Sequence, residues 1–131
     1  MTTLLADTHV LQWWSAEPDR LSTPAHDALE AAGEVAVAAI TWYELAWLAH
    51  NGRITVDLPL DTWLGTLARS VRTVALSPSI AATAVRLPDS FPSDPADRLI
   101  YATAIENGWP LVTKDAPLRR HKATPAARTI W

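Results

Sequence analysis

The segment that decides the fold is Thr3-Leu4-Leu5-Ala6-Asp7, a short apolar run that ends on a carboxylate. Similar short apolar runs recur along the chain, separated by longer stretches with helical patterns. We expect strands at residues 3–6, 35–40, 71–76, 111–113 and 128–131. Because these runs are apolar rather than alternating, they are typical of strands that are covered on both faces.

Helical signals fill the intervals between the apolar runs. The sequence predicts helices at residues 22–33, 41–52, 60–70, 79–87 and 94–108. The last of these begins at Asp94-Pro95 and closes at Asn107-Gly108, which are typical residues for the two ends of a helix. Strands that alternate with helices predict an α/β fold, in which helices cover both faces of a parallel sheet.

Length and composition narrow the class of protein. A chain of 131 residues, of which 49% are hydrophobic, is suited to a single globular domain spanning residues 1–131. The lack of cysteine excludes disulfide scaffolds, thiolate zinc sites and cysteine nucleophiles. Because we find neither a signal peptide nor a membrane-length apolar run, we expect a soluble, cytoplasmic protein that does not contact membranes. The net charge of −3 argues against a static DNA-binding module, but not against a nuclease whose acids hold metal ions.

Carboxylates recur beside the strand ends. The acids concerned are Asp7, Glu44, Asp94, Asp97 and Asp115. Because ligands of open parallel sheets bind beyond the carboxyl ends of the strands, we expect these acids to converge. Crowded carboxylates raise each other's pKa, and a hard cation such as Mg²⁺ or Mn²⁺ relieves the repulsion. Such an ion can polarise a phosphodiester and activate water, so the pattern favours a metal-dependent nuclease.

Most of these acids also have a structural interpretation. The pattern Thr41-x-x-Glu44 is a capping box, and Asp94 and Asp97 suit the first turn of a helix. Asp115 suits a turn before Ala116-Pro117. Asp7 has the weakest structural reason, because an acid that ends a buried strand gains little there. A convergence of all five is less probable by chance than any one alone, which favours the metal site.

The order of the motifs resembles the VapC type of PIN-domain proteins over essentially the whole chain. The residues that carry the resemblance are LLADTHVLQWW at 4–14, TWYELA at 41–46, NGRI at 51–54, DPADRLI at 94–100, LVTKD at 111–115 and RTIW at 128–131. Where many relatives have His, Lys and Phe, this chain has Pro92, Leu48 and Ala96. These departures concern contacts with substrate and remove no expected metal ligand.

The resemblance implies a three-layer α/β/α sandwich with a five-stranded parallel sheet. It implies an Mg²⁺- or Mn²⁺-dependent endoribonuclease that acts as the toxin of a toxin–antitoxin module, dimerises, and is neutralised by a small cognate antitoxin. The family's acidic quartet falls on Asp7, Glu44, Asp97 and Asp115. A further acid falls on Asp94, and a hydroxyl beside the site on Thr113. We therefore expect one or two ions at these residues.

Two other classes of function use a similar arrangement of acids. Receiver domains and aspartyl-phosphate phosphatases both carry acids at strand ends, but the phosphatase needs Asp where this chain has His9. The receiver needs a second acid near the first strand, and the chain has no glycine-rich phosphate loop. A catalytically weak PIN-fold protein that serves as a partner-binding module is the remaining alternative, and metal binding would separate the two.

Several other residues are candidates for contacts. We expect His9 to pack or cap locally rather than bind metal, and Trp47 and Trp63 to contribute to a dimer or antitoxin surface. Basic residues cluster around Asp115 and can contact RNA phosphates or form a solvated loop. These are Lys114, Arg119, Arg120 and Lys122.

Overall fold

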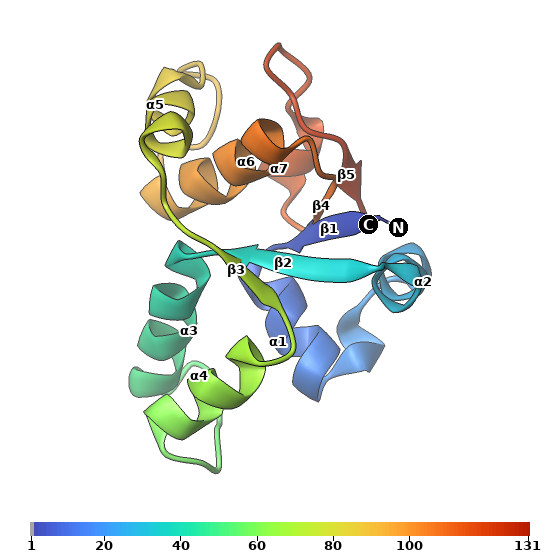
Figure 1. Cartoon of the computed structure of the whole chain (residues 1–131), viewed down its shortest axis with the longest axis vertical. Helices are drawn as coiled ribbons and strands as arrows, with labels where there is room; N and C mark the ends of the chain where they lie inside the picture. The colour runs from blue at the N-terminus through green and yellow to red at the C-terminus, as the bar shows by residue number, and fades with distance from the viewer. Residues whose placement is uncertain (1) are drawn as a thin grey trace.

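The computed structural model describes residues 2–131, and its helices and strands alternate along the chain as expected (Figure 1). In chain order the elements are β1 (Thr3–Ala6), α1 (Thr8–Ala16), the 3₁₀ helix η1 (Pro18–Arg20), α2 (Thr23–Ala31), β2 (Glu34–Ala38), α3 (Ile40–His50), α4 (Leu60–Ala68), β3 (Arg72–Val74), α5 (Pro78–Arg86), α6 (Pro95–Asn107), β4 (Leu111–Val112), α7 (Ala116–Arg120) and β5 (Thr129–Ile130). Among these described residues, no helix is long and apolar enough to cross a membrane.

The five strands form one parallel sheet in the order β3-β2-β1-β4-β5. β1 lies at the centre, where Leu5 pairs with Ala36 of β2 on one side and with Leu111 of β4 on the other. The chain leaves β1 toward β2 and returns on the opposite side of β1 to form β4. This reversal creates a switch point at the carboxyl ends of β1 and β4, where open α/β sheets bind their ligands.

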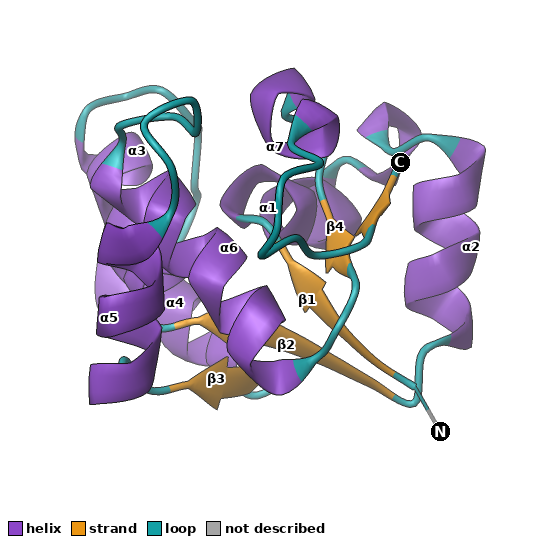
Figure 2. Ribbon diagram, turned by 90° about the horizontal axis from the view of Figure 1, so that it is seen from above, coloured by secondary structure: helices purple, strands orange, loops and turns teal. Residues whose placement is uncertain are grey.

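Successive strand residues face opposite sides of the sheet and build two separate cores. Leu4, Ala6 and Val37 belong to a core shared with α1, α2 and α3, whereas Leu5 and Ala36 belong to a core shared with α6. Figures 1 and 2 show α1, α3 and α4 on one face of the sheet and α5, α6 and α7 on the other. The expected α/β/α sandwich with a five-stranded parallel sheet is therefore confirmed.

Some predicted boundaries were wrong. The second strand ends at Ala38 rather than at residue 40, because Ile40 already begins α3. The third, expected at 71–76, covers only Arg72–Val74, at the edge of the sheet. Asp115 begins α7 rather than a simple turn, since its side chain accepts a hydrogen bond from the backbone N–H of Leu118.

Arg98 fixes the loop that leads into α6. Its guanidinium donates hydrogen bonds of 2.9 to 3.3 Å to five backbone carbonyls. The acceptors are those of Ala84, Leu87, Pro88, Phe91 and Pro92. Most of these carbonyls lie in the segment between α5 and α6, which ends at Asp94. A planar group with five donors is thus used as a scaffold for the start of α6.

We expect Arg98→Lys to lower the free energy of unfolding by about 2 kcal/mol, because an ammonium group keeps the charge but cannot reach all five carbonyls. Urea unfolding measures the change, and Arg86→Lys at the exposed end of α5 is the matched control. Equal midpoints for the two variants would show that the carbonyl contacts of Arg98 do not stabilise the loop.

Candidate active site

All five predicted carboxylates line a single pocket of about 530 Å³. They reach it from the end of β1, from α3, from the start of α6 and from the residues that follow β4. His9, Trp13, Arg20 and Lys114 also line the pocket. The convergence expected from strand ends in a parallel sheet is therefore present in the structure.

Asp7 is held by two hydrogen bonds at the centre of the sheet. Its Oδ1 accepts the backbone N–H of Thr8 at 2.7 Å and its Oδ2 accepts the hydroxyl of Thr113 at 2.7 Å. Because Asp7 is also the N-cap of α1, the expectation that it has little structural role was wrong. The pKa of Asp7 is raised, chiefly because burial disfavours its charged form.

Thr113 connects Asp7 with Asp115. The hydroxyl of Thr113 donates to Asp7 and accepts the backbone N–H of Asp115 at 3.0 Å. Thr113 itself is buried and directly follows β4, which pairs with β1. One side chain thus sets the relative positions of two acids that lie far apart in sequence.

Glu44 is oriented by a chain of hydroxyl groups. The hydroxyls of Thr41 and Thr8 lie 3.1 Å apart, and that of Thr8 donates to Glu44 Oε1 at 2.5 Å. The capping-box interpretation of Thr41 and Glu44 was wrong, because α3 begins at Ile40 after Ala39, which makes no side-chain cap. The pKa of Glu44 is raised by burial first and then by the charges of nearby acids, while the bond from Thr8 opposes the rise.

Asp94 and Asp97 stand in the first turn of α6 and differ in their surroundings. Asp94 is exposed and caps the helix, since its Oδ1 accepts the N–H of Ala96 at 2.8 Å. Asp97 is half-buried, and its pKa is raised to about 7. Burial is the largest cause, and the charges of the four other acids in the pocket add to it.

The donor set of the pocket suits a hard divalent cation. Its acids offer only oxygen, which favours Mg²⁺ or Mn²⁺ over zinc. Burial and the mutual repulsion of the acids raise the pKa of Asp7, Glu44 and Asp97, and a bound cation would relieve both effects. Within residues 2–131, however, no three Asp, Glu or His side chains stand close enough together to form a metal-binding group. An ion bound in this arrangement would therefore be held directly by at most two of these side chains, and water would supply its other ligands.

Two polar residues of the site were absent from the sequence prediction: Thr8, which orients Glu44 from beneath the pocket lining, and Arg20, which lines the pocket. Thr8, which follows Asp7 and is buried, was missed although a hydroxyl beside an acid was a usable signal. Arg20 was missed because it comes from η1, which no sequence pattern had indicated. The guanidinium of Arg20 lies 4.9 Å from the ring centroid of Trp13, and Lys114 Nζ lies 5.8 Å from it.

His9 and the tryptophans occupy different environments. The His9 ring lies 5.8 Å from that of Trp13, which agrees with the local packing expected for it. Trp47 is 45% exposed and lines an apolar groove of about 400 Å³, which shares His9 and Glu44 with the acidic pocket. Trp63 is partly buried against the hydrophobic core, and its expected role in a contact surface stays a prediction.

Comparisons with known proteins agree with this geometry. Residues 4–123 match the PIN domain family. The chain is 63% identical to Ribonuclease VapC22 of Mycobacterium tuberculosis over the full length of both proteins. Its fold resembles a toxin–antitoxin complex from Klebsiella pneumoniae, with 22% identity, a TM-score of 0.65 and coverage of 93% of this chain and 92% of that one. It also resembles VapBC2 from Rickettsia felis, solved with a promoter DNA fragment, with 14% identity, a TM-score of 0.69 and coverage of 98% and 97%. The chain therefore belongs to the PIN domain family and, within it, is a VapC-type protein.

Proposed function

We propose that this chain is a metal-dependent endoribonuclease that hydrolyses RNA phosphodiester bonds as the toxin of a toxin–antitoxin module. The single observation that carries the proposal is the convergence of five carboxylates in one pocket at the switch point of the sheet. The full-length relative that is 63% identical is named a ribonuclease, which supports the same activity here. RNA as the substrate is consistent with a cytoplasmic location.

Asp7, Asp97 and Asp115 are the residues we assign to Mg²⁺ or Mn²⁺, directly or through water, with Glu44 completing the site and Asp94 at its rim. When bound, the ion polarises the scissile phosphodiester and lowers the pKa of the attacking water. PIN-domain ribonucleases generally use divalent metal, and the oxygen-only donors of the pocket support the choice of these two ions.

The remaining residues orient the acids and the substrate. Thr113 holds Asp7 and Asp115 in register, and Thr8 turns Glu44 toward the pocket. A carboxylate of the pocket that does not contact the ion directly is placed to accept a proton from the attacking water. Arg20 and Lys114 provide positive charge at the rim, where they can position phosphate groups.

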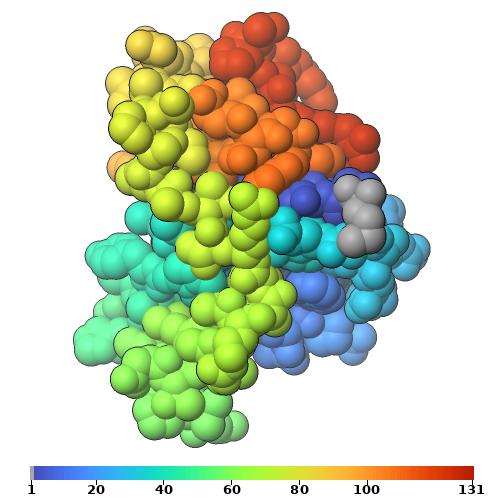
Figure 3. Space-filling view, viewed as in Figure 1, coloured from blue at the N-terminus to red at the C-terminus, as the bar shows by residue number. Residues whose placement is uncertain are grey.

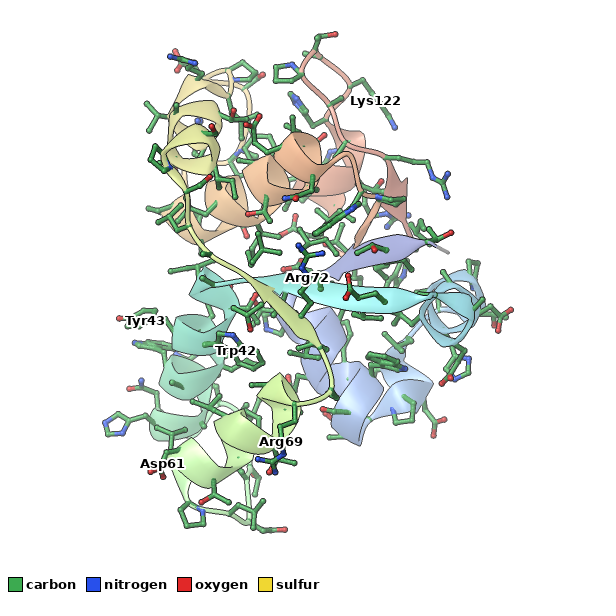
Figure 4. All side chains as sticks on the ribbon, in the orientation of Figure 1. Trp42, Tyr43, Asp61, Arg69, Arg72 and Lys122 are labelled. Carbon is green, nitrogen blue, oxygen red and sulfur yellow. The ribbon has the colours of Figure 1, made fainter. Side chains whose placement is uncertain are left out.

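The partners that fit this function are a small cognate antitoxin and a second copy of the chain. The solved complexes that share the fold are toxin–antitoxin pairs, which supports an antitoxin partner. The apolar groove beside the acidic pocket offers the exposed rings of Tyr43 and Trp47 for such a contact. The Tyr43 side chain points outward from α3 (Figure 4). A segment seated in this groove would lie against Glu44 and so obstruct the site.

We expect Asp7→Asn and Asp97→Asn each to reduce RNA cleavage at least about 100-fold, because each removes a charge that the ion and the proton transfer require. Both replacements keep the shape of the side chain, and Asn is also an effective N-cap at position 7. Cleavage of a mixed RNA pool is measured with Mg²⁺, with Mn²⁺ and with a chelator.

The matched control is Asp61→Asn, which removes the same charge from an exposed site on α4, outside the pocket (Figure 4). This variant should cleave like the parent. Undiminished cleavage by Asp7→Asn and Asp97→Asn would show that the site is misplaced. A folded parent that neither cuts RNA nor binds divalent metal would favour the alternative, a PIN-fold protein that serves as a partner-binding module.

The raised pKa of Asp97 predicts how metal-free stability depends on pH. Between its ordinary value of 3.8 and about 7, the folded chain keeps a proton on Asp97 that the unfolded chain has released. Because the folded state then binds more protons, the free energy of unfolding should fall as the pH rises through this interval. The pKa values of Asp7 and Glu44 are raised as well, so they act in the same direction.

Urea unfolding with a chelator at about pH 5 and about pH 8 measures this dependence, and Asp97→Asn should be less destabilised than the parent at the higher pH. Added Mg²⁺ should stabilise the parent more than Asp97→Asn at about pH 8, since a bound ion stabilises only the folded state. If parent and variant lose stability in parallel, folding does not raise the pKa of Asp97.

A further inference from the structure

Another pocket, of about 390 Å³, gathers exposed basic side chains of α7 and of the loop that follows it. Arg119, Arg120 and Lys122 line it together with Thr129 and Trp131. In the part of the chain that the structure describes, none of the three cations is paired with an acid, since the ion pairs there involve other residues. The protein as a whole has a net charge of −3, so this cluster is a local concentration of positive charge. Because no acid pairs with these three side chains in the described part of the chain, their charge is available to an anionic ligand.

The basic pocket is adjacent to the acidic one. Asp115 lines the acidic pocket, and the next residue, Ala116, lines the basic pocket. The rings of Trp13, in the acidic pocket, and Trp131, in the basic pocket, lie 6.0 Å apart. Lys114, which stands just before α7 in the chain, has its Nζ 5.8 Å from the centroid of the Trp13 ring. A line of cations and aromatic rings therefore leads from the carboxylates to Arg119 and Arg120.

Packing and hydrogen bonds on the inner side of α7 and of the following loop hold the backbone that carries Arg119, Arg120 and Lys122. Leu118, between the pocket residues of α7, is only 1% exposed. His121 packs edge-on against the Tyr101 ring, with centroids 5.4 Å apart, and its Nε2 lies 3.1 Å from the carbonyl oxygen of Pro125. The hydroxyl of Tyr101 accepts the backbone N–H of Ala127 at 2.8 Å. Both arms of the loop that carries Lys122 are thus anchored, which lowers the entropy lost on binding a ligand.

Phosphate is the ligand chemistry that this pocket suits best. Arginine presents a planar fork of donors that matches two phosphate oxygens, and lysine adds a point charge. Trp13, which is only 8% exposed, and Trp131, which packs against the same hydrophobic core, form the floor between these cations rather than free faces for stacking. The acidic pocket repels a polyanion on its own, so most of the attraction for RNA has to come from neighbouring surfaces.

We propose, resting on the ribonuclease function above, that Arg119, Arg120 and Lys122 form a second phosphate subsite for the RNA strand. The strand runs from the scissile phosphate at the carboxylates, past Trp13 and Trp131, to a phosphate held by the three cations. The subsite binds the backbone and reads no base directly, so it sets affinity and the register of the strand rather than sequence preference.

The test measures the binding of fluorescein-labelled single-stranded RNA by anisotropy, in the Asp7→Asn background so that no strand is cut. Adding Arg119→Gln and Arg120→Gln should weaken binding roughly tenfold at low salt. The slope of log affinity against log salt should become shallower by about 0.7 for each lost phosphate contact, or about 1.4 for the pair.

The matched control adds Arg69→Gln and Arg86→Gln instead, which changes the net charge equally at exposed positions outside both pockets. Arg69 lies near α4 and Lys122 lies at the opposite end of the molecule (Figure 4), and the surfaces of these two regions are well separated (Figure 3). The control should keep the parent slope. Arg119→Lys with Arg120→Lys should keep it too, because lysine still neutralises phosphate.

An unchanged affinity and slope in the Arg119→Gln, Arg120→Gln variant would overturn the proposal, as would a background protein that binds no RNA at low salt. Unchanged RNA binding together with weaker binding of an acidic peptide would overturn it in favour of a protein partner. Failure of the parent to cleave RNA would contradict the ribonuclease function instead, and is recorded in a separate assay. Circular dichroism confirms that each variant is folded.

Discussion

The hydrogen bond from Thr113 to Asp7 is the contact on which the site depends, because it joins the acid after β1 to the strand end of β4. It forms only if β1 and β4 pair in the observed register, in which Ala6 stands opposite Val112. That register places Asp7 and Asp115 at one edge of the sheet, while α3 and α6 bring Glu44 and Asp97 to the same place. The central strand pairing therefore decides both the fold and the position of the acids.

The same pocket carries a cost in stability. Burial raises the pKa of Asp7, Glu44 and Asp97, so each is held in surroundings that disfavour its charge. The hydrogen bonds from Thr8 and Thr113 offset part of this cost, and they do so while fixing the direction of the carboxylates. The two apolar cores on either side of the sheet stabilise the fold enough to offset the unfavourable burial of these acids.

Much of this architecture is predictable from local sequence. Apolar runs such as Thr3–Ala6 and the helix-start signal at Asp94-Pro95 are properties of neighbouring residues, so they predicted the sheet and the placement of most acids. The surroundings of Glu44 were not predictable, because the hydroxyl chain through Thr41 and Thr8 exists only after α1 packs beside α3. The packing of Trp63 against the core is likewise a tertiary property that local sequence does not show, and its place in a contact surface stays a prediction.

Three of the acids, Asp7, Asp94 and Asp115, are also the N-caps of α1, α6 and α7. Because each of these residues both belongs to the acidic site and caps a helix, only some substitutions remove activity without also weakening the fold. Replacement by Ala at such a position removes a cap worth about 1 kcal/mol along with the charge, whereas Asn caps a helix about as well as Asp. A descendant that abandons catalysis but keeps its partners would therefore be recognisable by asparagine at these three helix starts, with its fold and contact surfaces intact.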